Sequence, residues 1–311
     1  MPGPLAYLLQ AGATLVLDAS STPRPPCESN GNEVVVCARS DRPTTILPFS
    51  IGSVRGTVLV EPSGPRYLSC NPDFIARAGI ASEDRVPIGM VGPVEVVGNR
   101  AELPVRILDT EDKRQLRWSE YRPATRADCV TGPRAFDYRM VVFQLGRDRA
   151  DAVDTVLRFD GRDSSRIYAT LPVGKAKLPM RIELAYAGSV LTAPAARMIA
   201  PILGASVTGP AREEDIIDGV TRPVRTLELR QPLRVGPVAI PTLSVRIDDY
   251  GRADQLRTLA PDERSDEGDI VVRTKAEAPG AVRLLRVGRD AMAGCVSITL
   301  DLRKRTMTLR C

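Results

Sequence analysis

The chain has 311 residues, of which 43% are hydrophobic and 26% are charged, so it should fold around a sizeable core rather than stay disordered. Its 43 basic and 38 acidic side chains leave a formal charge of +5, too small for a dedicated nucleic-acid-binding protein, and we expect no nucleic-acid partner. The chain contains no histidine, which excludes Ser-His-Asp and Cys-His catalysis and two-histidine metal sites. We therefore expect neither metal nor cofactor. Carboxylates are the groups that remain most available for acid–base catalysis.

The N-terminal segment is typical of a secretory signal peptide. An apolar run from Leu5 to Leu17 is too short to span a bilayer, and the small residues Ala19–Ser21 follow it. We predict a signal peptide over residues 1–21, an N-terminal extension over 22–44, and export to the periplasm or the medium without a transmembrane segment. No basic residue precedes Leu5, so a buried N-terminal segment is the alternative.

Short strand-like segments dominate the rest of the chain. Segments rich in valine and leucine alternate throughout with turn-forming residues, among them 26 prolines and 24 glycines. This pattern is typical of many short strands joined by turns, and convincing long amphipathic helices are few. The sequence therefore predicts an all-β fold.

The sequence also repeats itself. Residues 51–72 align with 173–194 without gaps, and two further matches follow in the same order. We therefore predict two copies of one β-rich lobe, over residues 45–160 and 161–311, packed across a pseudo-two-fold axis with a cleft between them. The first match pairs Gly52 with Gly174, Glu61 with Glu183 and Pro72 with Pro194; the further matches pair 91–107 with 235–247 and 145–160 with 287–301.

Six cysteines form an even set with no CxxC spacing. Two strand-like runs around residues 303–305 predict a hairpin that brings the last two cysteines together, and the first two would close a small loop. Three disulfides in an oxidising compartment are the prediction, with free buried thiols as the alternative. The predicted pairs are Cys27–Cys37, Cys70–Cys129 and Cys295–Cys311.

Each copy has a glycine turn, a strand, a loop and a helical segment that begins with proline, and a Gly-Arg-Asp element comes later. The second copy, where Gly288–Asp290 precedes strand-like runs at 297–302 and 306–309, resembles the retropepsin-like and pepsin-like aspartic peptidases. The resemblance covers about residues 45–311. It implies two β-barrel-like lobes, each with one or two short helices, and one aspartate from each lobe meeting at the cleft to hydrolyse a peptide bond.

The sequence departs from the family where the catalytic aspartates belong, because it contains no Asp-Thr-Gly or Asp-Ser-Gly. Two substitutes are open: Glu61 with Glu183 as a glutamate pair, and Asp109 in the segment Leu108–Glu111. The residues at the motif positions are Ser63 and Gly64 in the first copy, and Ala185, Tyr186, Ala187, Gly188 and Ser189 in the second.

The predicted function is that of an exported, non-catalytic pseudo-protease that binds an extended peptide or protein segment in the cleft between the lobes. Backbone hydrogen bonds to strand edges would survive the loss of the two acids. Two alternatives are an active aspartic endopeptidase with unconventional carboxylates and an envelope-associated structural scaffold.

Overall fold

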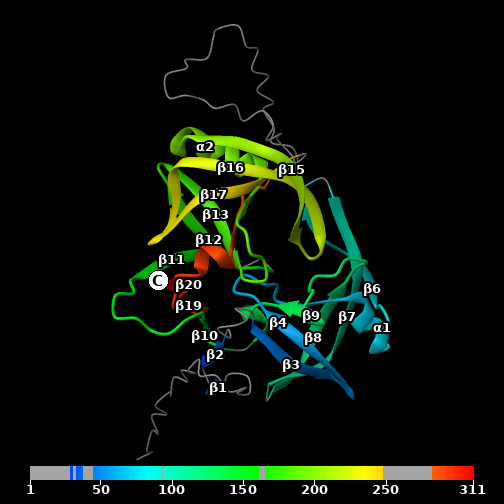
Figure 1. Cartoon of the computed structure of the whole chain (residues 1–311). Helices are drawn as coiled ribbons and strands as arrows, with labels where there is room; N and C mark the ends of the chain where they lie inside the picture. Colours follow the sequence, from blue (N-terminus) through cyan, green and yellow to red (C-terminus); the bar gives the residue numbers. More distant parts are fainter. Residues whose placement is uncertain are drawn as a thin grey trace, which may run out of the picture.

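The computed structural model describes the backbone of residues 29–30 and 33–37, and then residues 45–311 except 93, 109, 137, 161–164 and 248–281. Strands dominate these residues and helices are few and short (Figure 1), which confirms the predicted mostly-β character. The predicted signal peptide and most of the predicted N-terminal extension lie outside the described residues.

The first half of the structure contains a closed barrel. Six strands follow one another in the order β3-β4-β9-β5-β8-β7, and the ring closes because Phe49 of β3 pairs with Ile107 of β7. Among the described residues, strand β6 pairs only with β7 and forms a sheet edge. The elements are β3 (Thr45–Ile51), β4 (Val54–Val60), β5 (Leu68–Cys70), α1 (Pro72–Arg77), β6 (Asp84–Val91), β7 (Val94–Ile107), β8 (Thr110–Trp118), β9 (Cys129–Thr131), a 3-10 turn (Pro133–Ala135), β10 (Met140–Gln144) and β11 (Asp154–Asp160).

The second half has the same order of elements. Its strands do not close into a ring, because β12 pairs with β11 rather than with β16. The elements are β12 (Tyr168–Val173), β13 (Ala176–Glu183), β14 (Val190–Leu191), α2 (Ala193–Leu203), β15 (Ala205–Ile217), β16 (Val220–Val235), β17 (Val238–Arg246), β18 (Leu285–Gly288), a 3-10 turn (Arg289–Met292), β19 (Ser297–Asp301) and β20 (Thr306–Arg310).

The pairing pattern of the first half recurs in the second. The strand pairs β3–β4, β4–β9, β5–β9 and β5–β8 have the same directions as β12–β13, β13–β18, β14–β18 and β14–β17. Gly52 and Gly174 occupy the equivalent turns with φ of 56° and 57°, a left-handed conformation that favours glycine. The first sequence match therefore pairs structurally equivalent residues.

The other two sequence matches are wrong. Residues 235–247 form β17, whose parallel partner is β14, so β17 is the equivalent of β8 and not of β7 within 91–107. Similarly, residues 146–148 lie between β10 and β11, whereas Gly288–Asp290 leads from β18 into the 3-10 turn before β19. Short β-strands of similar composition gave matches in the wrong register.

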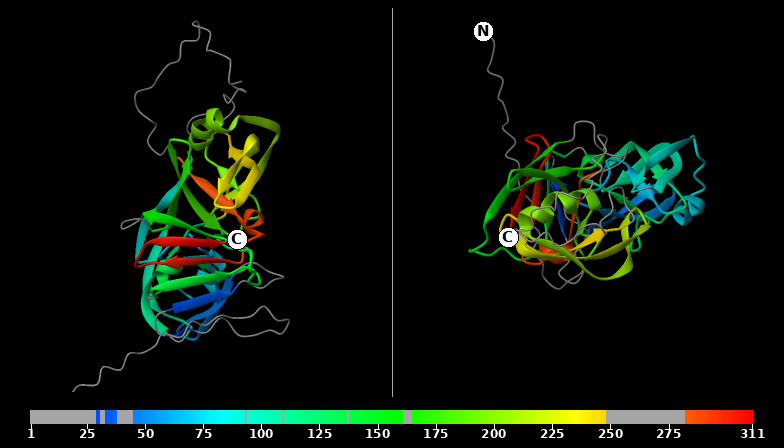
Figure 2. Two further views of the ribbon diagram at one scale, coloured as in Figure 1. Left: turned by 90° about the vertical axis from the view of Figure 1, so that its left-hand side faces the viewer. Right: turned by 90° about the horizontal axis from the view of Figure 1, so that it is seen from above.

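A shared sheet connects the two halves. The closing hairpin of the second half, β19–β20, lies between β10 and β11 of the first, as Figure 2 shows by the red strands between green ones. Strand β2 (Glu33–Cys37) adds in parallel to β10, and β1 (Ser29–Asn30) pairs with β2. Together with the sheet of the second half, these strands make one thirteen-stranded sheet.

Two of the predicted disulfides are present. Cys70 on β5 pairs with Cys129 on β9, where the two residues are cross-strand neighbours. Cys295 and Cys311 flank the β19–β20 hairpin and are joined across its open end. The third prediction involves Cys27 and the Cys37 side chain, which lie outside what the structure describes.

Candidate functional site

The loops that follow β4 and β13 meet at the boundary between the two halves. The backbone N–H of Ser63 donates to the Ile182 carbonyl at 3.1 Å, and the Ile182 N–H donates to Ser63 Oγ at 2.9 Å. Ser63 is fully buried. The structure therefore brings together the two segments in which the family resemblance places the catalytic motifs.

Glu61 lies in this boundary with its carboxylate already hydrogen-bonded. Its Oε2 accepts the backbone N–H of Leu184 at 2.6 Å, and its Oε1 accepts that of Ala185 at 2.7 Å. The side chain is buried, and burial together with the nearby Glu183 charge raises the pKa of Glu61 to about 8 despite these N–H donors. Burial therefore makes Glu61 easier to protonate than an exposed glutamate.

Glu183, the equivalent residue in the second half, is held by arginines instead. Its Oε1 lies 3.3 Å from Arg166 Nη1 and 3.3 Å from Arg181 Nε, and all three side chains are buried. The difference between the halves has a local cause at each of the two donor positions. The N–H of Ser63, which is equivalent to that of Ala185, donates to the Ile182 carbonyl instead of to Glu183. Pro62 occupies the position equivalent to Leu184, and proline has no N–H to donate to Glu183.

Arg166 links Glu183 to a hairpin tip of the second half. Its Nη2 lies 2.9 and 3.0 Å from the two carboxylate oxygens of Asp218, which sits in the turn between β15 and β16. Arg166 thus bridges Glu183 and Asp218, and both acids have a cation at hydrogen-bond distance. Such a buried network within the second half leaves neither carboxylate free for chemistry.

The other residues at the motif positions mostly make backbone contacts with neighbouring segments. The loop Tyr186–Ser189 is tied to the segment that begins at Gly288, since the Gly288 N–H donates to Ser189 Oγ and the next two N–H groups donate to the Tyr186 and Ala187 carbonyls. In the first half, Gly64 lies against Thr131 so closely that a Cβ would fall 2.2 Å from its carbonyl oxygen. Asp109 lies outside the described residues.

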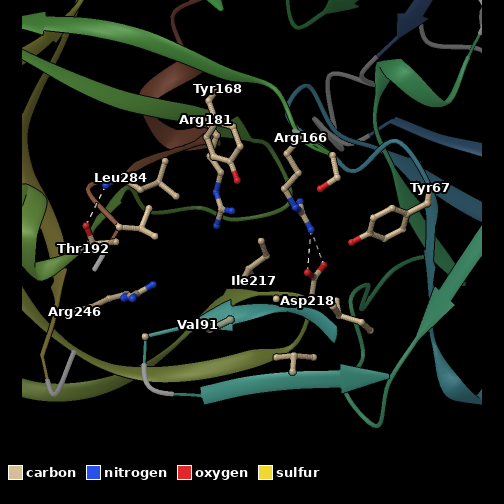
Figure 3. Close-up of a pocket in the computed structure, with 16 residues that line it drawn as sticks. Tyr67, Val91, Arg166, Tyr168, Arg181, Thr192, Ile217, Asp218, Arg246 and Leu284 are labelled. Carbon is tan, nitrogen blue, oxygen red and sulfur yellow. Dashed lines mark hydrogen bonds and ion pairs between the residues drawn. The ribbon is translucent and has the colours of Figure 1, made fainter. Parts of the chain in front are cut away.

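A cavity of about 220 Å³ opens between the two halves (Figure 3). The first half contributes Tyr67 and the tip of the β6–β7 hairpin, including Val91. The second half contributes the β15–β16 tip and a cluster of arginines. Three guanidinium groups and one carboxylate line the cavity among the described residues: Arg166, Arg181, Arg246 and Asp218.

The two hairpin tips also close over the cavity. Val91 and Val96 of the β6–β7 hairpin pack with Ile216 and Val220 of the β15–β16 hairpin in one apolar cluster. Because these hairpins are equivalent in the two halves, each half supplies the same element to the cover. The strand edge at β6 lies directly beside the cavity.

A smaller cavity of about 140 Å³ lies at the loop that follows β13. Ala185 and Tyr186 line it together with Asp215 and residues 123–126. Burial raises the pKa of Asp215 to about 6, and its Oδ1 makes no hydrogen bond within the described part of the chain. Neither cavity is lined by Glu61 or Glu183.

Neither the family models searched nor the curated proteins searched contain a match to this chain. No described helix is long and apolar enough to cross a membrane. In the same part of the chain, no three histidine, cysteine, aspartate or glutamate side chains come together as a metal site would require.

Sequence reasoning missed the arginines. Arg181 stands between Met180 and Ile182 in an apolar strand, two residues before the Glu183 that was singled out. An arginine in a buried apolar run needs a partner, and that signal was available in the sequence. The partnership of Arg166 with Asp218 was not, because 52 residues separate them.

Proposed function

We propose that this chain is an exported, non-catalytic protein with the aspartic peptidase fold, which binds an extended peptide between its two halves. The repeated pairing pattern and the meeting of the loops after β4 and β13 support the family assignment. The disulfides Cys70–Cys129 and Cys295–Cys311 support export to an oxidising compartment.

The proposal that the protein is non-catalytic depends on the hydrogen bonds and ion pairs of the two glutamates. Both oxygens of Glu61 accept backbone N–H groups, and Glu183 is held by Arg166 and Arg181. An aspartic dyad instead needs two acids that face a shared water and the substrate carbonyl from an open cleft. Here the acids face the protein, and neither lines a described cavity.

The exposed edge of β6 supports an extended peptide as the ligand. Strand β6 is the last strand of its sheet, so one row of its backbone N–H and C=O groups has no strand partner among the described residues. Ile88, Gly89 and Val91 of this strand line the larger cavity. A peptide that adds to this edge would place alternate side chains into the cavity.

Thermal unfolding of the full-length exported protein with short extended peptides tests the proposal. Peptides of alternating valine and threonine should raise Tm in a concentration-dependent way. The matched control is the same peptide with proline at alternate positions, which lacks the N–H groups needed for strand pairing. Absence of stabilisation by any peptide, or equal stabilisation by the proline control, would contradict the proposal and favour a scaffold.

A second candidate function, an active endopeptidase, is favoured by one observation. The Glu183 charge contributes to the raised pKa of Glu61, as in a pair of acids that share one proton. Incubation with a denatured protein between pH 3 and pH 7, with and without a statine-type inhibitor, separates the two functions. Inhibitor-sensitive cleavage that is lost in both Glu61→Gln and Glu183→Gln would establish the peptidase and reject the non-catalytic proposal.

A further inference from the structure

We propose that the larger cavity is a carboxylate-binding subsite in which Arg181 receives one acidic group of the bound peptide. This inference rests on the proposed function, because it names the chemistry of the residue that the peptide would insert between the halves. The Arg181 side chain and the residues that line the cavity around it support this subsite.

Arg181 is buried, yet most of its hydrogen-bonding capacity is unused. Its side chain is only 5% exposed, and its Nε lies 3.3 Å from Glu183 Oε1 as an ion pair that does not meet hydrogen-bond geometry. Within the described residues, the Arg181 side chain makes no hydrogen bond. Figure 3 shows its guanidinium directed into the cavity. A buried guanidinium with open donors is costly unless an acceptor joins it.

Two other buried arginines of this region direct their Nη groups at protein acceptors, although the Nε of Arg286, like that of Arg181, has no hydrogen-bond partner among the described residues. Arg166 contacts both Asp218 oxygens and Glu183. Arg286 donates through Nη1 to the Asp215 and Ile216 carbonyls at 2.7 Å and through Nη2 to Glu214 at 2.8 Å. Arg181 therefore differs from its neighbours in having both Nη groups directed at a cavity rather than at protein acceptors.

Further polar groups surround the same space. Arg246 lines the cavity, and in Figure 3 its guanidinium extends toward the space that Arg181 faces. The Thr192 hydroxyl oxygen accepts the Leu284 N–H at 3.1 Å, which leaves its O–H as a donor. Apolar side chains such as Val91 and Ile217 form other parts of the wall. Charge-assisted bonds made beside this apolar part of the wall are stronger than in water.

Size and charge favour a single carboxylate as the occupant. A volume of about 220 Å³ is below the roughly 300–1,000 Å³ of pockets that enclose a whole small ligand. The planar guanidinium matches a carboxylate by two parallel hydrogen bonds. Because Glu183 already offsets part of the Arg181 charge and Asp218 lines the same cavity, a monoanion suits the site better than a doubly charged phosphate.

Calorimetry with defined peptides tests the ligand side on the unmodified protein. The probes are an extended valine–threonine peptide with one central glutamate, its glutamine counterpart, and each of these with a free or an amidated C-terminus. The glutamate or the free C-terminus should improve affinity tenfold or more over the fully amidated glutamine peptide. The two single-acid peptides show whether the carboxylate comes from a side chain or from a chain end.

Variants test the protein side. Arg181→Met should remove the preference for the acidic peptide, and Arg181→Lys should keep the charge but lose most of the preference because it lacks the planar fork. Arg197→Met is the matched control, since Arg197 is exposed on α2 and its loss changes net charge by the same amount. If Arg181→Met does not fold, Arg181→Lys and the peptide comparison still decide the question.

The outcomes separate this inference from the proposed function. Equal binding of all four peptides, unaffected by Arg181→Lys, overturns the carboxylate subsite and leaves peptide binding intact. If no peptide binds but N-acetylglutamate amide does, in an Arg181-dependent way, the subsite stands and the proposed function fails. Tighter binding of inorganic phosphate than of N-acetylglutamate amide overturns the choice of a carboxylate, and absence of all binding overturns both proposals.

Discussion

Glu61 of the first half accepts the backbone N–H of Leu184 in the second half at 2.6 Å, and the reverse bond is missing. Glu183 occupies the equivalent position, but the residue after Glu61 is Pro62, which has no N–H. One side of the boundary is therefore closed by backbone donors and the other by Arg166 and Arg181. Two residues account for this asymmetry: Pro62 has no N–H, and the N–H of Ser63, the equivalent of Ala185, donates to the Ile182 carbonyl instead.

The raised pKa of Glu61 predicts a pH-dependent stability. In the unfolded chain this carboxyl ionises near its ordinary pKa of 4.5, whereas in the folded protein its pKa is about 8. Between these values the folded state holds a proton that the unfolded state has released, so the free energy of unfolding falls as pH rises. The fall approaches about 1.4 kcal/mol per pH unit for one proton.

Because the chain contains no histidine, no imidazole contributes to the pH dependence of unfolding between about pH 6 and about pH 8. Urea unfolding at several pH values in this window, with disulfides intact, measures the slope. Glu61→Gln cannot ionise and should show a much flatter profile. A wild-type slope that persists in Glu61→Gln would show that another group is responsible.

Arg166 should be among the least replaceable residues of the buried ionic network in the second half. Arg166→Met would leave Glu183 with Arg181 alone and would remove the cation that contacts both oxygens of Asp218. Removing one member of a buried ionic network typically costs about 3–5 kcal/mol, because the remaining charges stay buried. Chemical denaturation of Arg166→Met measures this loss, with the exposed Arg197→Met as the control for net charge.

A double-mutant cycle adds a check that the loss arises from this network. Asp218→Asn in the Arg166→Met background should cost less than it does in the wild type, since its partner is already gone. Strict additivity of the two substitutions would contradict direct coupling of Arg166 with Asp218.

Local patterns in the sequence identified the parts of the structure that depend on near neighbours. The glycine turn at Gly174 and the cross-strand cysteines Cys295 and Cys311 follow from short-range spacing. The equivalence of the Glu61 and Glu183 positions in the two halves also follows from the first repeat. Partnerships across long separations did not, because strand composition says nothing about which distant hairpin tip supplies Asp218 to Arg166. The same lack of long-range information put the second and third repeat matches in the wrong register.

Gly288 is predicted to be essential for a close backbone contact. A Cβ at this position would lie 2.3 Å from the carbonyl oxygens of both Ala187 and Gly188, which are backbone atoms that cannot rotate away. Gly288→Ala should therefore lower the free energy of unfolding by about 1–3 kcal/mol or more, as overpacking does in cores. Gly294→Ala is the matched control, because no atom outside its chain neighbours lies within 4 Å of a Cβ there. Thermal unfolding of both variants makes the comparison, and equal Tm values would contradict the close contact.

The two disulfides should differ in their contribution by the length of chain they enclose. Cys70 and Cys129 are 59 residues apart and Cys295 and Cys311 are 16 apart, so the chain-entropy relation gives about 4 and about 3 kcal/mol respectively. Paired alanine substitutions followed by denaturant unfolding measure each loss. The second disulfide has an additional role, since it closes the β19–β20 hairpin that lies between β10 and β11. If its removal costs more than that of Cys70–Cys129, the shared sheet rather than loop length sets the order, because opening this hairpin disturbs the pairing of both halves at once.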